Sequence, residues 1–127
     1  MLILMVAVGG AVGAVARYGL GGWVQGFVST SFPMGTLVVN ALGSMILGFT
    51  FLVMEGLALS GEVRAMVAIG FLGAFTTFST FSYEAVVLFQ GGEWMRGGVY
   101  VGGSVILGLA GVLAGLALGS FFLHMRG

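Results

Sequence analysis

The chain has 127 residues, of which 59% are hydrophobic and 6% are charged, and its formal net charge is zero. A soluble domain carries about 25% charged residues, so this composition excludes an ordinary soluble fold and indicates solvation by lipid. The four basic and four acidic residues give no basic surface for nucleic acid, and the absence of cysteine excludes disulfides and thiolate chemistry.

Four apolar segments are each long enough to cross a bilayer, which takes about 20 mostly apolar residues in a helix. The first segment has no basic n-region and runs past signal-peptide length, so we expect a retained membrane helix. The sequence therefore predicts an all-α integral membrane protein, with one four-helix transmembrane domain over residues 1–127. The expected spans are residues 2–27, 34–54, 65–89 and 94–122.

Glycines are spread through these spans, and several recur four residues apart. The pairs are Gly9 and Gly13, Gly22 and Gly26, and Gly111 and Gly115. Small residues at this spacing let the backbones of neighbouring helices approach closely. Although membrane helices are often glycine-rich, we favour close packing, because four short spans have few other ways to hold together.

The third span loses its apolar character after Gly70. Hydroxyl groups gather there on Thr76, Thr77, Ser79, Thr80 and Ser82. Lipid offers no hydrogen-bond partners, so these groups are expected to face protein or a watery pore. Gly70, Gly73 and the β-branched Thr76–Thr77 pair also weaken a helix locally, and a broken helix frees carbonyls that can coordinate a cation. The alternative is a kinked helix whose carbonyls are satisfied by threonine hydroxyls.

Phe78 and Phe81 are three residues apart and share one helical face. An aromatic ring has a positive edge, so a ring turned edge-on can favour an anion. Phenylalanine at helical spacing more often packs in a core or against lipid, but the density of hydroxyl groups favours the functional interpretation.

Asn40 lies within the second span, and Thr36, Asn40 and Ser44 form a polar stripe at four-residue spacing. The amide of Asn40 can line a pore or tie two helices together, and the sequence leaves both interpretations open. On the fourth span, Tyr100 and Ser104 are also four apart and can continue a track of hydroxyls.

Arg17 is costly inside a span unless it reaches the interface or finds a partner. Glu84, toward the end of the third span, is either an acid at a pore mouth, the partner of Arg17, or an interfacial residue. No enzyme site is evident, because His124 is the only histidine, lysine is absent, and no acids are paired within a span.

The arginines give no clear orientation in the membrane. Four spans place both termini on one side, with Arg64 and Arg126, while the other side has Arg96, and also Arg17 if it lies toward the far end of the first span. Topology follows the imbalance of Lys and Arg between short loops, and here the count is equal. The chain is therefore expected to insert in both directions and to pair as an antiparallel, dual-topology dimer, unless a single arginine decides its orientation.

Three motifs in chain order resemble the Fluc family of fluoride channels, also called CrcB proteins. They are GGAVGA at residues 9–14 followed by Arg17 and Tyr18, FPMGTLVVN at residues 32–40, and GFLGAFTTFSTFS at residues 70–82. Length and number of spans also match over the whole chain. The resemblance implies a fluoride-selective channel in the cell membrane, formed by a homodimer with two antiparallel pores that export cytoplasmic fluoride passively.

The resemblance also assigns roles to individual residues. It implies an aromatic box of Phe78 and Phe81, a pore amide at Asn40, and a structural Na⁺ at the dimer centre on the carbonyls of Gly73 and Thr76. The family's hydroxyl track would correspond here to Thr77, Ser79 or Thr80, together with Tyr100 and Ser104. Arg17 and Glu84 match the family's basic and acidic residues. Gly108 stands where a further hydroxyl would extend the track on the fourth span.

Two rival functions remain. A small multidrug exporter also has four short spans and can insert both ways, but it needs a carboxylate in the membrane, typically in the first span, and the first span here has no acid. A subunit that only assists assembly would leave the hydroxyls of the third span without a purpose.

Overall fold

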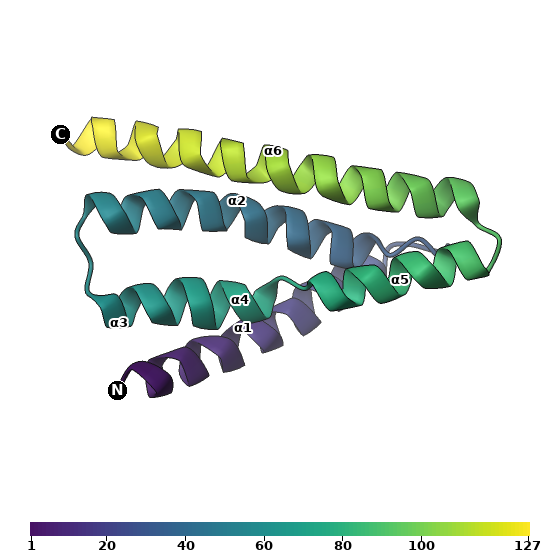
Figure 1. The fold of residues 1–127 in the computed structure, drawn as a ribbon, viewed down its shortest axis with the longest axis horizontal. Helices are drawn as coiled ribbons and strands as arrows, with labels where there is room; N and C mark the ends of the chain where they lie inside the picture. The colour runs from purple at the N-terminus through teal and green to yellow at the C-terminus, as the bar shows by residue number, and fades with distance from the viewer.

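The computed structural model describes residues 1–127 and contains helices only. Four helical segments are long and apolar enough to cross a membrane, which confirms the expected all-α membrane fold. They are α1 (Leu2–Gln25), α2 (Met34–Gly56), the segment Gly61–Gln90 and α6 (Trp94–Arg126). Both termini lie at the same end of the molecule (Figure 1), as an even number of spans requires.

The third segment is interrupted, as predicted. It consists of α3 (Gly61–Arg64), a π-helix η1 (Ala65–Leu72), α4 (Gly73–Phe75) and α5 (Phe78–Gln90). Between α4 and α5 the backbone of Thr76 (φ −91°, ψ 157°) and Thr77 (φ −151°, ψ 118°) is extended, and the gap in the ribbon is visible near the middle of Figure 1. Gly73 lies in the last helical turn before the break rather than in the break itself.

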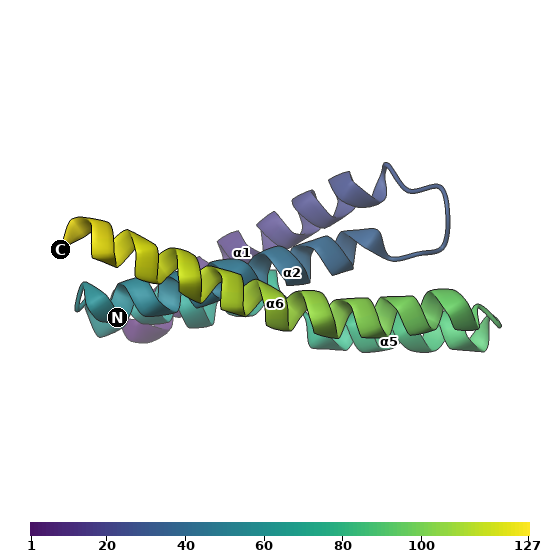
Figure 2. The same cartoon turned by 90° about the horizontal axis from the view of Figure 1, so that it is seen from above.

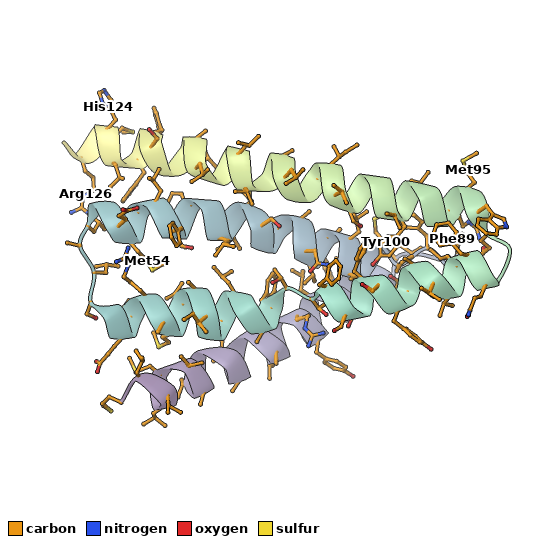
Figure 3. All side chains as sticks on the ribbon, in the orientation of Figure 1. Met54, Phe89, Met95, Tyr100, His124 and Arg126 are labelled. Atoms are coloured by element: carbon orange, nitrogen blue, oxygen red, sulfur yellow. The ribbon has the colours of Figure 1, made fainter.

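Two helix ends differ from the expected spans by four residues, and the others by two or fewer. The third segment begins at Gly61 because the side chain of Ser60 caps it, with Oγ accepting from Val63 N at 3.3 Å. At the other end of the chain, α6 continues to Arg126. His124 and Arg126, which were expected to form a polar tail, are therefore helical. Figure 3 shows His124 pointing away from the neighbouring helices there.

Glycine contacts join α1 to η1. A Cβ at Gly9 would collide with the carbonyl of Met66, one at Gly13 would collide with the carbonyl of Phe71, and one at Gly70 would lie 2.6 Å from the Val6 oxygen. These helices therefore touch backbone to backbone, which confirms the close packing expected for Gly9 and Gly13.

The same kind of contact joins α2 to α6, which run side by side in Figure 1. A Cβ at Gly111 would lie 2.9 Å from the Ala41 oxygen, and one at Gly115 would collide with the carbonyl of Met45. The expectation was wrong for Gly22, where an added Cβ would meet no atom within 4 Å. Toward this end α1 tilts away from α5 and α6 (Figure 2) and contacts α2 through Gly21 instead, since a Cβ at Gly35 would collide with the Gly21 carbonyl.

A small core lies between α5 and α6. Tyr100 is completely buried, and its ring centroid lies 5.6 Å from that of Phe32 and 5.3 Å from that of Phe81. Figure 3 shows Tyr100 pointing from α6 toward α5. Elsewhere large apolar side chains face outward, such as Val15 and Leu113, as expected of a chain solvated by lipid.

Candidate functional site

Asn40 fixes the position of the break in the third segment. Its Nδ2 donates to the carbonyl of Thr77 at 3.0 Å, and its Oδ1 accepts from the backbone N–H of Thr77 at 2.8 Å. The Thr77 side chain in turn begins α5, because its Oγ1 accepts from Thr80 N at 3.2 Å. An amide NH₂ has two donors, so Asn40 ties the helices together and still has one N–H to offer.

Arg17 also reaches the break. Its Nε donates to the carbonyl of Ala74 at 3.0 Å, and the side chain is half-buried. The charge therefore stays within the span instead of extending along the chain to the interface. A guanidinium carries five N–H donors, so most of them remain free beside the break.

Three carbonyls at the break receive no hydrogen bond. Thr76 directs both its N–H and its Oγ1 to Leu72 O, at 3.1 and 2.9 Å, and Thr77 N turns to Asn40. No side chain and no turn or cap N–H bonds to the oxygens of Gly73, Phe75 and Thr76, and Thr80 N, one turn after Thr76, bonds to Thr77 Oγ1 instead. The structure has no group of three or more His, Asp or Glu side chains that could hold a metal, so a cation here would depend on such carbonyls.

A first cavity of about 540 Å³ lies beside α1, α2 and α5, and we call it the polar cavity. Its polar lining residues are Arg17, Tyr18, Gln25, Ser31, Thr36, Thr77, Thr80 and Glu84. Glu84 accepts a hydrogen bond from Thr36 Oγ1 at 2.6 Å, and the Tyr100 hydroxyl lies 3.5 Å from the same carboxylate oxygen. Glu84 thus shares a cavity with Arg17, but its hydrogen bonds go to Thr36 and Tyr100.

A second cavity of about 440 Å³ lies between α2, α5 and α6, and we call it the phenylalanine cavity. Its lining includes Asn40, Ser44, Thr76, Thr77, Phe78, Phe81 and Ser104. The Phe78 and Phe81 ring centroids are 5.8 Å apart, and Phe78 is 80% exposed. The Ser104 hydroxyl is buried and has no hydrogen-bond partner. Thr77 is the one residue that lines both cavities.

The structure thus divides the predicted site residues into groups. Asn40, Phe78, Phe81 and Ser104 meet in the phenylalanine cavity, while Arg17, Thr80 and Glu84 line the polar cavity, with Thr77 between. Three predicted residues, Gly73, Ser79 and Tyr100, line neither cavity. Ser79 is exposed, with its Oγ 3.4 Å from Thr77 Oγ1, and Tyr100 lies behind Phe81.

Gln25 was missing from the predicted site, although it lines the polar cavity. Its Nε2 donates to Phe32 O at 3.0 Å, and its Oε1 accepts from Gly35 N at 2.9 Å. This side chain therefore holds the connection that leads into α2. The sequence shows only that Gln25 is a polar residue near the end of a span. A polar residue at that position is usually interfacial, so the sequence did not mark Gln25 as part of a site.

A surface network joins the two connections at the end opposite the termini. Ser31 Oγ lies 2.7 Å from a Glu93 oxygen, and Arg96 forms a salt bridge with the same carboxylate. The hydrogen bond from Ser31, together with the hydrogen bond and the positive charge of Arg96, lowers the pKa of Glu93. Ser31 and Glu93 are 62 residues apart, so no local pattern could have revealed the network.

Sequence comparison identifies the family. Residues 4–116 match the family described as "CrcB-like protein, Camphor Resistance (CrcB)". The chain belongs to the CrcB family. A relative from Thermus thermophilus named "Fluoride-specific ion channel FluC" is 54% identical over 117 residues, which cover 91% of each chain. One of the same name from Rhizobium etli is 48% identical, over 91% of this chain and 93% of the relative.

Membership of the CrcB family agrees with the architecture. The four apolar helices and the family together make this chain a multi-pass protein of the plasma membrane. A third relative, from Nitratidesulfovibrio vulgaris, carries the same channel name at 44% identity over 92% of this chain and 95% of its own. These CrcB relatives are named as channels and not as enzymes.

Proposed function

We propose that this chain is a fluoride-selective channel through which cytoplasmic fluoride leaves the cell passively, by two antiparallel pores in a homodimer. One observation carries the proposal. The break held by Asn40 and Thr77 brings a spare amide N–H, an unpaired Ser104 hydroxyl and two phenylalanine rings to one cavity. The names of the CrcB relatives support fluoride as the ion.

The chemistry of these groups suits a small anion. Fluoride is strongly hydrated, so a narrow pore must replace its water with close donors, and each must bind weakly enough to release the ion. Asn40, Thr77 and Ser104 supply N–H and O–H groups, and the ring edges of Phe78 and Phe81 carry partial positive charge. None of these groups is a fixed charge that would trap the anion.

The polar cavity is the approach to this pathway. Arg17 attracts an anion toward the break, and Thr80 offers a hydroxyl beside Thr77. In this arrangement Glu84 and Tyr100 act on the pathway from the side, because Glu84 holds Thr36 and Tyr100 supports the ring of Phe81. Ser79, on the outer surface of α5, would join the pathway only through a neighbouring subunit.

A second copy of the chain would complete the site. Phe78 is 80% exposed, and Gly73 is exposed as well, so neither residue is covered by its own chain. With Arg17 held inside its span, Arg64 and Arg126 at one end and Arg96 at the other differ by a single charge, so the bias toward one orientation is weak. An antiparallel partner would cover the exposed phenylalanine and generate two equivalent pores.

The unpaired carbonyls fit a structural Na⁺ at the centre of this dimer. Unwound backbone carbonyls coordinate Na⁺ in other membrane proteins, and here the oxygens of Gly73 and Thr76 have no hydrogen-bond partner. One chain offers this pair, and its partner would offer a second pair. The ion would hold the two broken helices together and place a positive charge near the anion pathway.

Fluoride efflux from liposomes containing the purified protein tests the proposed function, with chloride efflux as the control. We expect rapid loss of fluoride and negligible loss of chloride. A well-folded dimer that loses no fluoride would refute the proposal. Proton-coupled uptake of organic cations by the same liposomes would instead support the small multidrug exporter.

A further inference from the structure

We propose that Ser44 of α2 is a further residue of the ion pathway, which offers its hydroxyl to the anion beyond Asn40 in the phenylalanine cavity. The inference rests on the proposed fluoride-channel function. It starts from the hydrogen bonds of helical serines and threonines, which can bond to the carbonyl one turn earlier.

The Ser44 hydroxyl has no such bond. Thr50 donates to Ile46 O at 2.8 Å and Ser82 donates to Phe78 O at 2.9 Å, whereas Ser44 makes no hydrogen bond within the chain. Ser44 is half-buried in the middle of an apolar span. An unpaired hydroxyl is costly in such surroundings unless water or a ligand completes it.

The neighbours of Ser44 place this hydroxyl on the pathway. Ser44 lines the phenylalanine cavity together with Ser104, whose buried hydroxyl is also unpaired. One turn after Ser104, α6 presents Gly108, and a Cβ at Gly108 would lie 3.8 Å from Ser44 Oγ. The Ser44 oxygen therefore faces Gly108, the position at which α6 has no side chain.

The order of groups along the cavity gives Ser44 its role. Asn40 and Ser44 are four residues apart on one helix, which corresponds to about 6 Å along its axis. The remaining lining beyond them, Leu47, Leu109 and Val112, is apolar. Ser44 is thus the last hydrogen-bond donor of α2 in this cavity, and a fluoride ion that leaves Asn40 would find its next donor there.

Ser44→Ala tests the inference in the liposome assay. We expect fluoride efflux to fall about tenfold, the size of effect expected when one hydrogen bond to a charged group is lost. The melting temperature should stay unchanged, because the hydroxyl has no partner in the protein. Thr50→Ala is the matched control, since it removes a hydroxyl of α2 that lies outside both cavities. It should conduct like the wild type.

A second hydroxyl from the opposite wall separates a pore role from a packing role. Gly108→Ser, added to Ser44→Ala, should restore much of the flux, because the space beside Ser44 accepts a side chain. Unchanged flux in Ser44→Ala, or a loss that a well-folded double variant does not recover, would overturn the inference alone. A wild type that loses no fluoride would overturn the proposed function, and this inference with it.

Discussion

Asn40 combines two uses in one side chain. Its carbonyl oxygen and one N–H hold the extended backbone of Thr77, while its second N–H remains free at the phenylalanine cavity. The two interpretations that the sequence left open, a helix tie and a pore amide, are therefore compatible. The tie is observed, and the proposed pore role rests on the donor that the tie leaves over.

Phe81 gives a prediction at the level of one ring. Phe81→Ile keeps an apolar side chain but removes the ring edge, so we expect slower fluoride efflux from a dimer that still forms. Loss of the contact with Tyr100 should cost about 1 kcal/mol of stability. Efflux from liposomes and size-exclusion chromatography in detergent measure the two effects.

Phe71→Ile is the matched control for this prediction. Phe71 also belongs to an aromatic pair, with its ring centroid 5.6 Å from that of Phe75, but it lines neither cavity. It should lose a similar amount of stability and keep its flux. Equal flux in Phe81→Ile and the wild type would remove Phe81 from the pathway.

The residues of the site were predictable to different degrees. Asn40 stands out because an amide is unusual in an apolar span, and Phe78 and Phe81 stand out because hydroxyl residues surround them; the structure brings all three to one cavity. The bond between Asn40 and Thr77 spans 37 residues, so it depends on the packing of two helices and not on any local pattern. The same holds for Tyr100, whose burial is decided by the rings of its neighbours.

The broken third segment was predictable as an element, but its details were not. β-Branched threonines after glycines favour a break, and the extended residues are Thr76 and Thr77. The π-helix η1 was not expected, because residues 65–72 are almost uniformly apolar and such a run has no periodicity to reveal the helix type. Its backbone contacts with α1 at Gly9 and Gly13 became clear only in three dimensions.

Glycine packing between α2 and α6 gives a prediction for a pair of elements. In Gly115→Ala the new methyl group would collide with the carbonyl of Met45 and lie 2.8 Å from Phe49 N. We expect overpacking to cost about 1–3 kcal/mol, seen as a lower melting temperature. Gly102→Ala on the same helix has no atom within 4 Å and should be neutral. Equal melting temperatures for both variants would contradict the packing described.

The Glu93 network gives a prediction for pH. Its lowered pKa means that the folded state favours the carboxylate, so the stabilisation is present above the ordinary value of 4.5 and is lost as pH falls through the lower folded pKa. Glu93→Gln should therefore melt slightly below the wild type at pH 7, and the difference should disappear in acid. Thermal melting of both proteins across this range provides the measurement. A difference that persists below that pKa would assign the effect to something other than the charge.

At the level of the whole molecule, the balance of arginines predicts that small changes of charge set the orientation. Ser29→Lys and His124→Lys add a charge at exposed positions on opposite sides of the membrane. Each variant should insert in one direction only. If the active form is an antiparallel dimer, each variant alone should pass little fluoride, and the two expressed together should recover flux.

Orientation can be read from one added thiol. The chain has no cysteine, so Gly127→Cys at the exposed C-terminus can be labelled from one side of the membrane without background. Gly127→Cys alone should label from both sides, and Gly127→Cys combined with either lysine substitution should label from one side. Full flux from a variant of uniform orientation would exclude the antiparallel arrangement.

Thr77, as the residue common to both cavities, has a consequence for the response to voltage. If ions and water fill the space on either side, the electric field across the bilayer concentrates at the short wall that Thr77 and Asn40 form. An elementary charge gains about 2.3 kcal/mol for each 100 mV that it crosses. A fluoride ion would then gain most of that energy within one short step, so membrane potential would drive its exit mainly at the broken helix.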